Sequence, residues 1–354
     1  MFIVDAHLDL AYNALKYNRD LKATVEAVRE KEANRKHPNG TAMVTLPSLQ
    51  AAGVGIVFST IFVEPARGKK GTSTDDLIYR DAEEAFISGQ AQLDYYHRLA
   101  DEVETIRLIG DLADLDAVVA SHQEGQEPLL GLVPLLEGAD PIREPAEAEL
   151  WYERGLRVIG LAWDDTRYSA GAWRGIGGLT KEGRHLLEIM ADLGFILDLT
   201  HMAEEAIFQA LDRYEGVIVA THSNARALVS GQRQLSDLQI KRIAERDGVI
   251  GIVLFNGFLK EGYAKGDPKS TVTMENIVSH IDHICQCVGD AAHVGIGSDF
   301  DGGFGVEASP EGIDTHSDLR LLSLALEENG YSKYDVAAIM GGNWLSLIRD
   351  AFNH

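Results

Sequence analysis

FIVDAHLD, residues 2–9 of the chain, is an apolar run that turns polar at its end. Its first half predicts a buried strand, because aromatic and β-branched residues favour strands. His7 and Asp9 are two residues apart, so an extended backbone directs both side chains to one face. An imidazole nitrogen and a carboxylate oxygen aimed at one point can bind a divalent metal ion. Taken alone, the pair is more typical of side chains that hydrogen-bond the backbone at a strand end.

Seven further β-rich runs follow this first one, and longer amphipathic stretches separate them. The eight runs lie at residues 2–4, 54–63, 129–136, 156–162, 195–199, 217–220, 249–254 and 294–297. Clear helical patterns lie at residues 181–193, 203–214, 236–246 and 274–288. The alternation predicts an α/β fold with a parallel sheet, and the number of runs is that of a closed (β/α)8 TIM barrel. A doubly wound open sheet is the alternative, but no Gly-x-Gly-x-x-Gly motif follows the first run. We expect one domain over residues 1–354.

The composition limits the partners and the compartment. A formal net charge of −23 argues against nucleic acid and against anionic membranes as partners. No apolar run approaches the roughly 20 residues of a membrane span, and we expect no signal peptide. The two cysteines, Cys285 and Cys287, are two residues apart on a predicted helix and point to different sides. We therefore expect neither a disulfide nor a shared thiolate metal site, which fits a reducing cytoplasm.

Ligand-type side chains recur where the predicted strands end. In a barrel these ends meet at one rim, which would bring six such residues together. They are His7, Asp9, Glu137, His201, His222 and Asp299. Burying unpaired like charges costs several kcal/mol, so six convergent residues are hard to explain structurally. A pair of divalent ions about 3.5–4 Å apart, sharing a carboxylate and a water, removes that cost.

These strand ends resemble those of the membrane (renal) dipeptidase family of zinc peptidases, within the amidohydrolase superfamily, and especially its bacterial members. The motifs occur in the family's order and at similar intervals: HLD at 7–9, LEG at 136–138, DLTH at 198–201, THSNAR at 221–226 and GIGSDFDG at 295–302. The resemblance runs from the first motif to the end of the chain. It implies a metal-dependent hydrolase barrel with two Zn²⁺ ions per chain, and other divalent ions would also fit.

The resemblance also assigns the metal ligands. It implies that His7 and Asp9 hold one ion and that His201 and His222 hold the other. Glu137 would bridge the two ions.

Two more residues receive roles from the resemblance. Asp299 would take a proton from the attacking water and pass it to the leaving amine. Arg233 falls where family members carry an arginine that binds the terminal carboxylate of a dipeptide. A planar guanidinium suits a carboxylate better than an ammonium does. From its position alone, Arg233 is more often an ordinary residue before the helix predicted near Ser236.

The sequence departs from the family pattern at four positions near the rim. Trp163 stands where mammalian members carry a histidine that binds the substrate carbonyl, although bacterial members have tryptophan there. Asp164 replaces an asparagine, Ala139 a histidine and Phe255 a tyrosine. We expect Trp163 and Phe255 to contact the substrate, and the changes put the substrate preference in doubt, but not the metal centre.

The function that follows is a zinc-dependent dipeptidase that hydrolyses peptide bonds and tolerates a D-residue at the C-terminal position. The partner would be a small dipeptide, and a homodimer is one open arrangement. Hydrolysis of N-acyl amino acids, lactones or cyclic amides on the same centre is an alternative. A silent metal-binding protein is a second, but it would have no reason to keep Asp299.

Two loops are candidate lids, and one helix carries a candidate pair of histidine ligands. Residues 64–80, with the basic Lys69 and Lys70, and residues 165–178, rich in Gly, Trp and Arg, are either lids or ordinary surface loops. His280 and His283 are three residues apart on a predicted outer helix. We interpret them as surface residues and not as a ligand pair.

Overall fold

Eight parallel strands form a closed ring in the computed structural model, which describes residues 1–34, 37–67 and 77–353. The strands are β1 (Ile3–Leu8), β2 (Val54–Phe62), β6 (Leu130–Glu137), β7 (Val158–Gly160), β8 (Ile196–Asp198), β9 (Ile218–Val219), β10 (Ile250–Ile252) and β11 (Val294–Ile296). Each strand pairs with its neighbour in chain order, and β11 pairs with β1. A parallel bridge between Ala220 and Ile250 joins β9 to β10. This closure confirms the predicted (β/α)8 barrel and excludes the open sheet.

Three short strands were not predicted. β5 (Ile106–Leu108) pairs with β6 outside the ring, and β3 (Glu64–Pro65) pairs with β4 (Ile78–Tyr79) beside it. Runs of two or three residues are too short to show a period of two, which explains why they escape sequence patterns. Lys69 and Lys70 lie outside the described residues.

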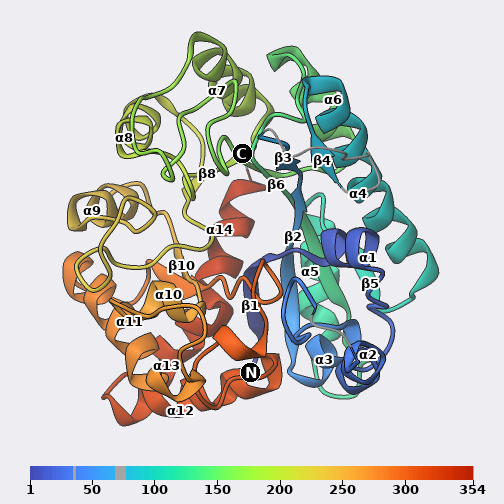
Figure 1. Ribbon diagram of the computed structural model, residues 1–354, viewed down its shortest axis with the longest axis vertical. Coiled ribbons are helices and arrows are strands. Elements are labelled where there is room, and N and C mark those ends of the chain that lie inside the picture. Colours follow the sequence, from blue (N-terminus) through green and yellow to red (C-terminus); the bar gives the residue numbers. More distant parts are fainter. Residues whose placement is uncertain (35–36, 68–76, 354) are drawn as a thin grey trace.

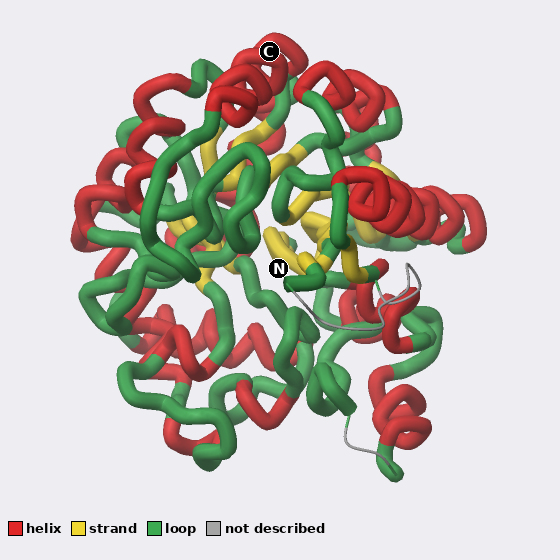
Figure 2. The backbone as a smooth tube through the Cα atoms, turned by 45° about the horizontal axis from the view of Figure 1, so that its top comes forward, coloured by secondary structure: helices red, strands yellow, loops and turns green. Residues whose placement is uncertain are grey.

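The helices surround the strands, as Figure 1 and Figure 2 show. They are α1 (Leu10–Tyr17), α2 (Val25–Glu32), α3 (Leu46–Ala51), α4 (Ala82–Glu102), α5 (Leu112–Ser121), α6 (Ala148–Glu153), α7 (Lys181–Leu193), α8 (Glu204–Arg213), α9 (Asp237–Ala244), α10 (Asn256–Leu259), α11 (Met274–Val288), α12 (Leu319–Glu328), α13 (Lys333–Ala337) and α14 (Asn343–Ala351). The helices expected at 181–193, 203–214, 236–246 and 274–288 are present as α7, α8, α9 and α11. Within the described ranges, none of the helices combines the length and apolar character needed to cross a membrane.

Local sequence signals set the ends of these helices. The Thr180 side chain accepts a hydrogen bond from the backbone N–H of Gly183 and so caps the start of α7. At its end Gly194 adopts a left-handed conformation, φ 79°, which glycine tolerates without strain. α9 begins with a capping box between Ser236 and Gln239. α7 and α9 thus have defined starts, which also fix where the loops before them end.

The interior of the barrel is filled by side chains from most of the strands and from α14. These residues form one cluster and include Val4, Ala6, Ile56, Phe58, Val133, Leu135, Val158, Ile196, Val219, Trp344 and Ile348. The Trp344 indole donates a hydrogen bond to the Ile296 carbonyl at 3.0 Å. α14 lies near the middle of the view in Figure 1. This helix therefore packs against the inside of the barrel, which is a solid core and not a channel.

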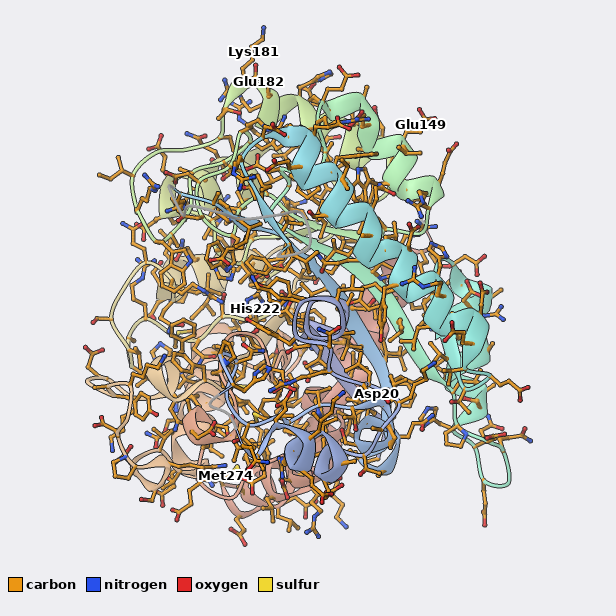
Figure 3. The ribbon with its side chains drawn as sticks, turned by 45° about the vertical axis from the view of Figure 1, so that its right-hand side comes forward. Asp20, Glu149, Lys181, Glu182, His222 and Met274 are labelled. Carbon is orange, nitrogen blue, oxygen red and sulfur yellow. The ribbon has the colours of Figure 1, made fainter. Side chains whose placement is uncertain are left out.

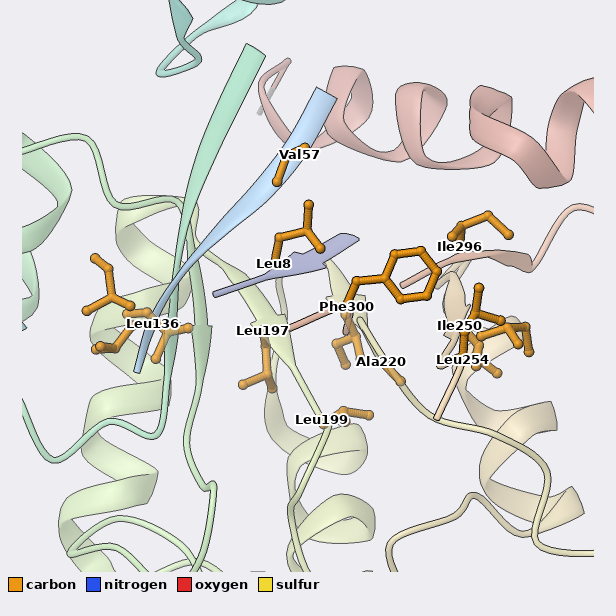
Figure 4. Packing of buried hydrophobic residues seen from close by; sticks show 14 of the residues in the cluster. Leu8, Val57, Leu136, Leu197, Leu199, Ala220, Ile250, Leu254, Ile296 and Phe300 are labelled. Carbon is orange, nitrogen blue, oxygen red and sulfur yellow. The ribbon is translucent and has the colours of Figure 1, made fainter. Parts of the chain in front are cut away.

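A second, larger cluster packs the strands against the outer helices. Figure 4 shows part of it, with Leu8, Val57 and Ile296 on neighbouring strands of the ring. Along β6, Leu132 and Leu136 belong to this outer cluster, whereas Val133 and Leu135 belong to the interior one. Because side chains alternate along a strand, Glu137 continues the inner face of β6 to the rim of the barrel.

Small residues allow the last strands to approach the segment that precedes His222. A Cβ atom at Gly251 would overlap the carbonyl oxygen of Thr221, and one at Gly297 would overlap the same oxygen. A Cβ atom at Gly160 would meet its nearest neighbours at an ordinary 3.6 Å. Glycine is therefore required at 251 and 297 by close approach of the backbone.

We predict that Gly251→Ala lowers the free energy of unfolding by about 1–3 kcal/mol, because the added methyl group forces the strands apart. The matched variant Gly160→Ala should stay within about 1 kcal/mol of wild type. Urea unfolding of the two variants measures the difference. Equal effects would show that the approach at Thr221 is not tight.

Candidate metal centre

The six ligand-type side chains predicted for the rim lie together at the carboxyl ends of five strands. His7 lies on β1 and Glu137 ends β6, while Asp9, His201, His222 and Asp299 lie in the turns that follow β1, β8, β9 and β11. Figure 3 places His222 deep among the ribbons, whereas Lys181 and Glu182 project at the edge of the molecule. His7, His201 and His222 are at most 6% exposed, so the group forms inside the protein.

One half of the group is formed by His7, Asp9 and Glu137. One ligand atom from each lies within 4.8 Å of the others. The His7 Nε2 atom is 3.7 Å from Glu137 Oε2, too far for a hydrogen bond. The first segment of the chain thus places both of its ligand-type residues beside the carboxylate that ends β6.

The other half is formed by His201, His222 and the second oxygen of Glu137. Glu137 Oε1 lies 2.9 Å from His201 Nε2 and 3.4 Å from His222 Nε2, and the two imidazole nitrogens are 3.0 Å apart. His201 has a left-handed backbone, φ 68°, an uncommon conformation for a residue with a side chain. Glu137 therefore presents one oxygen to each half.

Asp299 joins the group from the end of β11. It also has a left-handed backbone, φ 59°. Its Oδ1 atom lies 3.8 Å from His7 Nε2, and a carboxylate oxygen of Asp299 lies within 4.8 Å of a ligand atom of His222. The Asp299 side chain is 14% exposed, which is more than the side chains of the three histidines. It can therefore face both the group of ligand-type residues and the solvent.

A buried hydrogen-bond relay orients His222. Asp198 accepts hydrogen bonds from the backbone N–H groups of Thr200 and Thr221, and from the Thr221 hydroxyl. The Thr221 oxygen lies 3.0 Å from His222 Nδ1. Because the hydroxyl proton goes to Asp198, the oxygen accepts the proton of Nδ1, which leaves the Nε2 lone pair facing the group. Supporting bonds of this kind fix metal-binding histidines in proteins.

A similar arrangement supports the first strand. Asp5 is fully buried and accepts hydrogen bonds from the backbone N–H groups of His7 and Ser298, and from the Ser298 hydroxyl. His316 Nε2 lies 2.7 Å from the second oxygen of Asp5. Asp5 thus ties the end of β1 to the end of β11, and it fixes His7 relative to Asp299.

Burial keeps the imidazoles neutral. It lowers the pKa of His7 to about 3, and it places the pKa values of His201 and His222 well below the usual 6.5. The positive charge of Arg233 and the neighbouring histidines lower the pKa values of His201 and His222 further. For His7, the negative charge of Asp5 partly opposes the effect of burial. A neutral imidazole is the form that binds a metal ion.

The carboxylates are destabilised as anions when no cation lies among them. Burial, followed by repulsion from Asp301, raises the pKa of Asp9 to about 7. Burial, followed by Asp9, also raises the pKa values of Glu137 and Asp299 well above their usual range. A cation bound among these three carboxylates would remove the repulsion.

The residues present fit divalent metal ions. Two buried atoms that face the group, His7 Nε2 and Asp9 Oδ1, have no hydrogen-bond partner among the described residues. Such atoms are costly unless something binds them. Three neutral imidazoles with three carboxylates form the donor set that zinc and related ions prefer.

Arg233 lies beside the group. Its Nη1 donates to Ser223 Oγ at 3.2 Å, its Nη2 donates to the His222 carbonyl at 2.9 Å, and its guanidinium lies over the ring of Phe258. Its buried Nε atom has no hydrogen-bond partner among the described residues. Burial lowers its pKa to about 10, and Asp299 and Glu137 counter that effect. The buried cation is therefore available to an anionic ligand.

Aromatic rings flank these residues. The Trp163 ring centre lies 6.3 Å from that of His201, and Trp173 lies 6.0 Å from the same ring. Phe258 lies 6.3 Å from Trp173 and 5.1 Å from Phe255. Phe255 also lines a cavity of about 710 Å³ between the loop after β10 and the segments at 29–33, 37–41 and 303–308. The rings thus form a wall that runs from His201 to this cavity.

Asp164 connects the two loops that were candidate lids. Its carboxylate pairs with Arg67 from the 64–80 loop and lies 3.4 Å from Nε of Arg174 in the 165–178 loop. The aspartate is only 5% exposed, so both cations are held at its buried oxygens. Ala139, which stands where the family carries a histidine, is fully buried.

Several residues around the group were missed from the sequence. Trp173 belongs to a loop already marked by its Gly, Trp and Arg content, but its contact with His201 depends on the folded path of that loop. Asp198 was quoted within a motif, yet its role as hydrogen-bond acceptor for Thr221 has no sequence signal. Phe258 and Ser223 gain their position beside Arg233 only in the fold.

Comparison with known proteins agrees with this geometry. The family described as membrane dipeptidase (peptidase family M19) matches residues 1–353. Dipeptidase tcpJ of Claviceps purpurea (strain 20.1) is 27% identical over 324 residues, or 87% of this chain and 69% of that protein. An uncharacterised protein in the pqqA 5′ region of Klebsiella pneumoniae is 30% identical over 236 residues, or 64% of this chain and 84% of that protein.

A solved structure extends the likeness to the whole fold. The crystal structure of dipeptidase AC, a metallopeptidase of family M19, superposes with a TM-score of 0.82 at 25% identity, covering 100% of this chain and 99% of that one. With a family match over residues 1–353, the chain belongs to the membrane dipeptidase family, whose members are metal-dependent hydrolases of dipeptides.

Proposed function

We propose that this protein hydrolyses dipeptides at a centre of two zinc ions. The observation that supports it most is the position of Glu137, whose two oxygens face two separate pairs of ligand-type residues. His7 and Asp9 would hold one ion, His201 and His222 the other, and Glu137 both. When bound, the ions would supply the Lewis acidity that activates a water and polarises the peptide carbonyl.

The neighbouring side chains would position the substrate. Arg233 binds the C-terminal carboxylate through its guanidinium, and this restricts the substrate to short peptides. Trp163 and Phe255, with Trp173 and Phe258, supply apolar walls for the substrate's side chains. We propose that a D-residue at the C-terminal position is accepted, since a metallopeptidase of Rhodobacter sphaeroides with a similar fold was solved with a phosphinate mimic of the dipeptide L-Ala-D-Ala.

Asp299 would carry the proton. Its carboxylate receives a proton from the attacking water and delivers it to the amine that leaves when the peptide bond breaks. Burial and the neighbouring Asp9 favour the protonated form of Asp299, and Arg233 favours the charged form. Such opposed effects allow one carboxylate to hold and release a proton during a single turnover.

We also propose that residues 1–354 form one domain and that the protein works in a reducing compartment, the cytoplasm. The two cysteines, Cys285 and Cys287, support the second point, since both are free thiols.

A substrate panel tests the function. Metal-loaded protein should hydrolyse L-L and L-D dipeptides and should be much slower on N-acyl amino acids, lactones and cyclic amides. Treatment with a chelator should abolish the activity, and zinc should restore it. Turnover of N-acyl amino acids alone would identify the protein as an amidohydrolase of another specificity.

Arg233→Met should raise KM about ten- to a hundredfold for free dipeptides and much less for dipeptide amides. The reason is that a charge-assisted pair is worth roughly 1.5–3 kcal/mol, and the amides lack the carboxylate. Arg226→Met is a matched control, because the Arg226 guanidinium already pairs with a carboxylate of the protein, that of Glu204, and also donates to Gln239. Arg226→Met should change KM equally for free dipeptides and for dipeptide amides. An equal change in Arg233→Met would show that Arg233 has a structural role and does not bind the carboxylate.

A further inference from the structure

A second group of metal-binding side chains lies on the outer helices, between α9 and α11. It consists of Asp237, the first residue of α9, and of His283 and Cys287 on α11. One ligand atom from each lies within 4.8 Å of the others. Figure 1 shows α9 and α11 next to each other at the outside of the barrel. The group shares no residue with the candidate centre at the rim.

The three side chains converge on one point. His283 Nε2 lies 2.8 Å from Asp237 Oδ1 and 3.5 Å from Cys287 Sγ. His283 and Cys287 are four residues apart on a helix, so both lie on one face of α11. Asp237 reaches the same point from a different helix. Nitrogen, oxygen and sulfur donors presented by two rigid elements form a donor set that zinc accepts.

From the sequence, the candidate partner of His283 was His280. In the structure, Asp237 and Cys287 lie beside His283 instead. His280 was interpreted as a surface residue, which is wrong, because it is fully buried. Its Nδ1 accepts the backbone N–H of Ala225 at 3.1 Å, and its Nε2 lies 3.3 Å from the Leu259 carbonyl. His280 therefore has a structural role, while His283 faces outward and has a thiol one turn along the helix.

We propose that Asp237, His283 and Cys287 bind a thiophilic divalent ion such as Zn²⁺, with water completing its coordination. The thiol of Cys287 loses its proton to solvent as the sulfur–metal bond forms, and His283 contributes the lone pair of Nε2. A thiolate and a carboxylate together balance the two positive charges of the ion. The Asp237 side chain is 54% exposed, so the ion enters directly from solvent.

Without a metal ion, Cys287 is not an activated, reactive thiol. Burial and the nearby Asp237 raise the pKa of the Cys287 thiol, so the metal-free side chain stays protonated near neutral pH. A bound ion would convert it to the thiolate and would join the start of α9 to α11. Cys285 has a different environment, since its thiol interacts with Tyr331. The two cysteines thus provide a matched pair.

Cobalt titration of metal-depleted protein tests the proposal. The ligands proposed at the rim include no sulfur, so a sulfur-to-cobalt charge-transfer band reports on the outer group alone, whether or not the rim binds metal. We expect a band that reaches its plateau within three equivalents per chain, two for the rim and one for the outer group, is absent in Cys287→Ser and is kept in Cys285→Ser. Asp237→Asn and His283→Gln should each weaken cobalt binding about tenfold or more.

Other outcomes would overturn the proposal. They are the absence of the band in wild type, its persistence in Cys287→Ser, or its equal loss in Cys285→Ser. Unchanged cobalt affinity in both Asp237→Asn and His283→Gln would show that Cys287 binds the ion without a built site. Circular dichroism and urea unfolding of each variant identify any band lost through misfolding. Peptidase activity is not part of the readout, so failure of the proposed function leaves this test unaffected.

Discussion

Asp299→Asn is expected to keep the bound metal and near-normal folding while kcat falls by about 10²–10⁴-fold. The amide has nearly the shape of the carboxylate but cannot accept a proton from water. The acidic limb of the pH–rate profile should also flatten, because that limb reports a group that must lose its proton before it acts. Metal content and kcat are measured on the same preparation.

Asp301→Asn is the matched control. Asp301 lies two residues further on and is more deeply buried, and it accepts hydrogen bonds from the backbone N–H groups of Met43 and Val44 and pairs with Arg19. Its loss should lower stability and leave kcat of the folded protein close to wild type. If Asp299→Asn keeps full metal and a kcat within about threefold of wild type, Asp299 is not in the mechanism. If it loses metal, Asp299 is a ligand.

Glu137→Gln should weaken the binding of both metal ions, by about 10–100-fold or more each, and abolish activity at ordinary zinc concentrations. The physical reason is its placement, with Oε1 facing His201 and His222 and Oε2 facing His7. Glutamine offers one neutral oxygen, so it cannot serve both sides or offset the charge of two cations. Elemental analysis after dialysis against buffered zinc measures the loss.

Two further variants show whether that loss comes from bridging. His7→Ala should remove mainly one ion, since it takes one ligand from one side. Glu147→Gln removes a carboxylate that pairs with Arg143 and belongs to none of the groups of ligand-type side chains, and it should keep both ions. If Glu137→Gln empties only one site while the other keeps wild-type affinity, then Glu137 does not bridge.

The sequence predicted the barrel and most of the rim because both depend on local patterns. Each strand is an apolar run, and residues such as Glu137 and His222 follow it directly. In a closed parallel barrel all such residues must meet at one end. The order and register of the strands are then enough to bring the ligand-type side chains, from His7 to Asp299, within a few ångströms of one another.

What the sequence did not predict depends on chain paths between these strands. The contact between Trp173 and His201 and the pairing of Asp164 with Arg67 join loops whose courses no periodic pattern reveals. The buried His280 was interpreted as exposed because the Ala225 backbone that it contacts belongs to a loop 55 residues earlier. Cys287 gains its neighbours in the same way, from the packing of α9 on α11.

Two metal ions acting together at the rim should both be needed for activity, and a stepwise reconstitution measures this requirement. Cys287→Ser protein, which lacks the outer thiolate, is stripped of metal and titrated with zinc while dipeptide hydrolysis is followed. Activity should rise with zinc up to two equivalents per chain and stay low at one. Full activity at a single equivalent, with no further zinc bound at saturation, would contradict it.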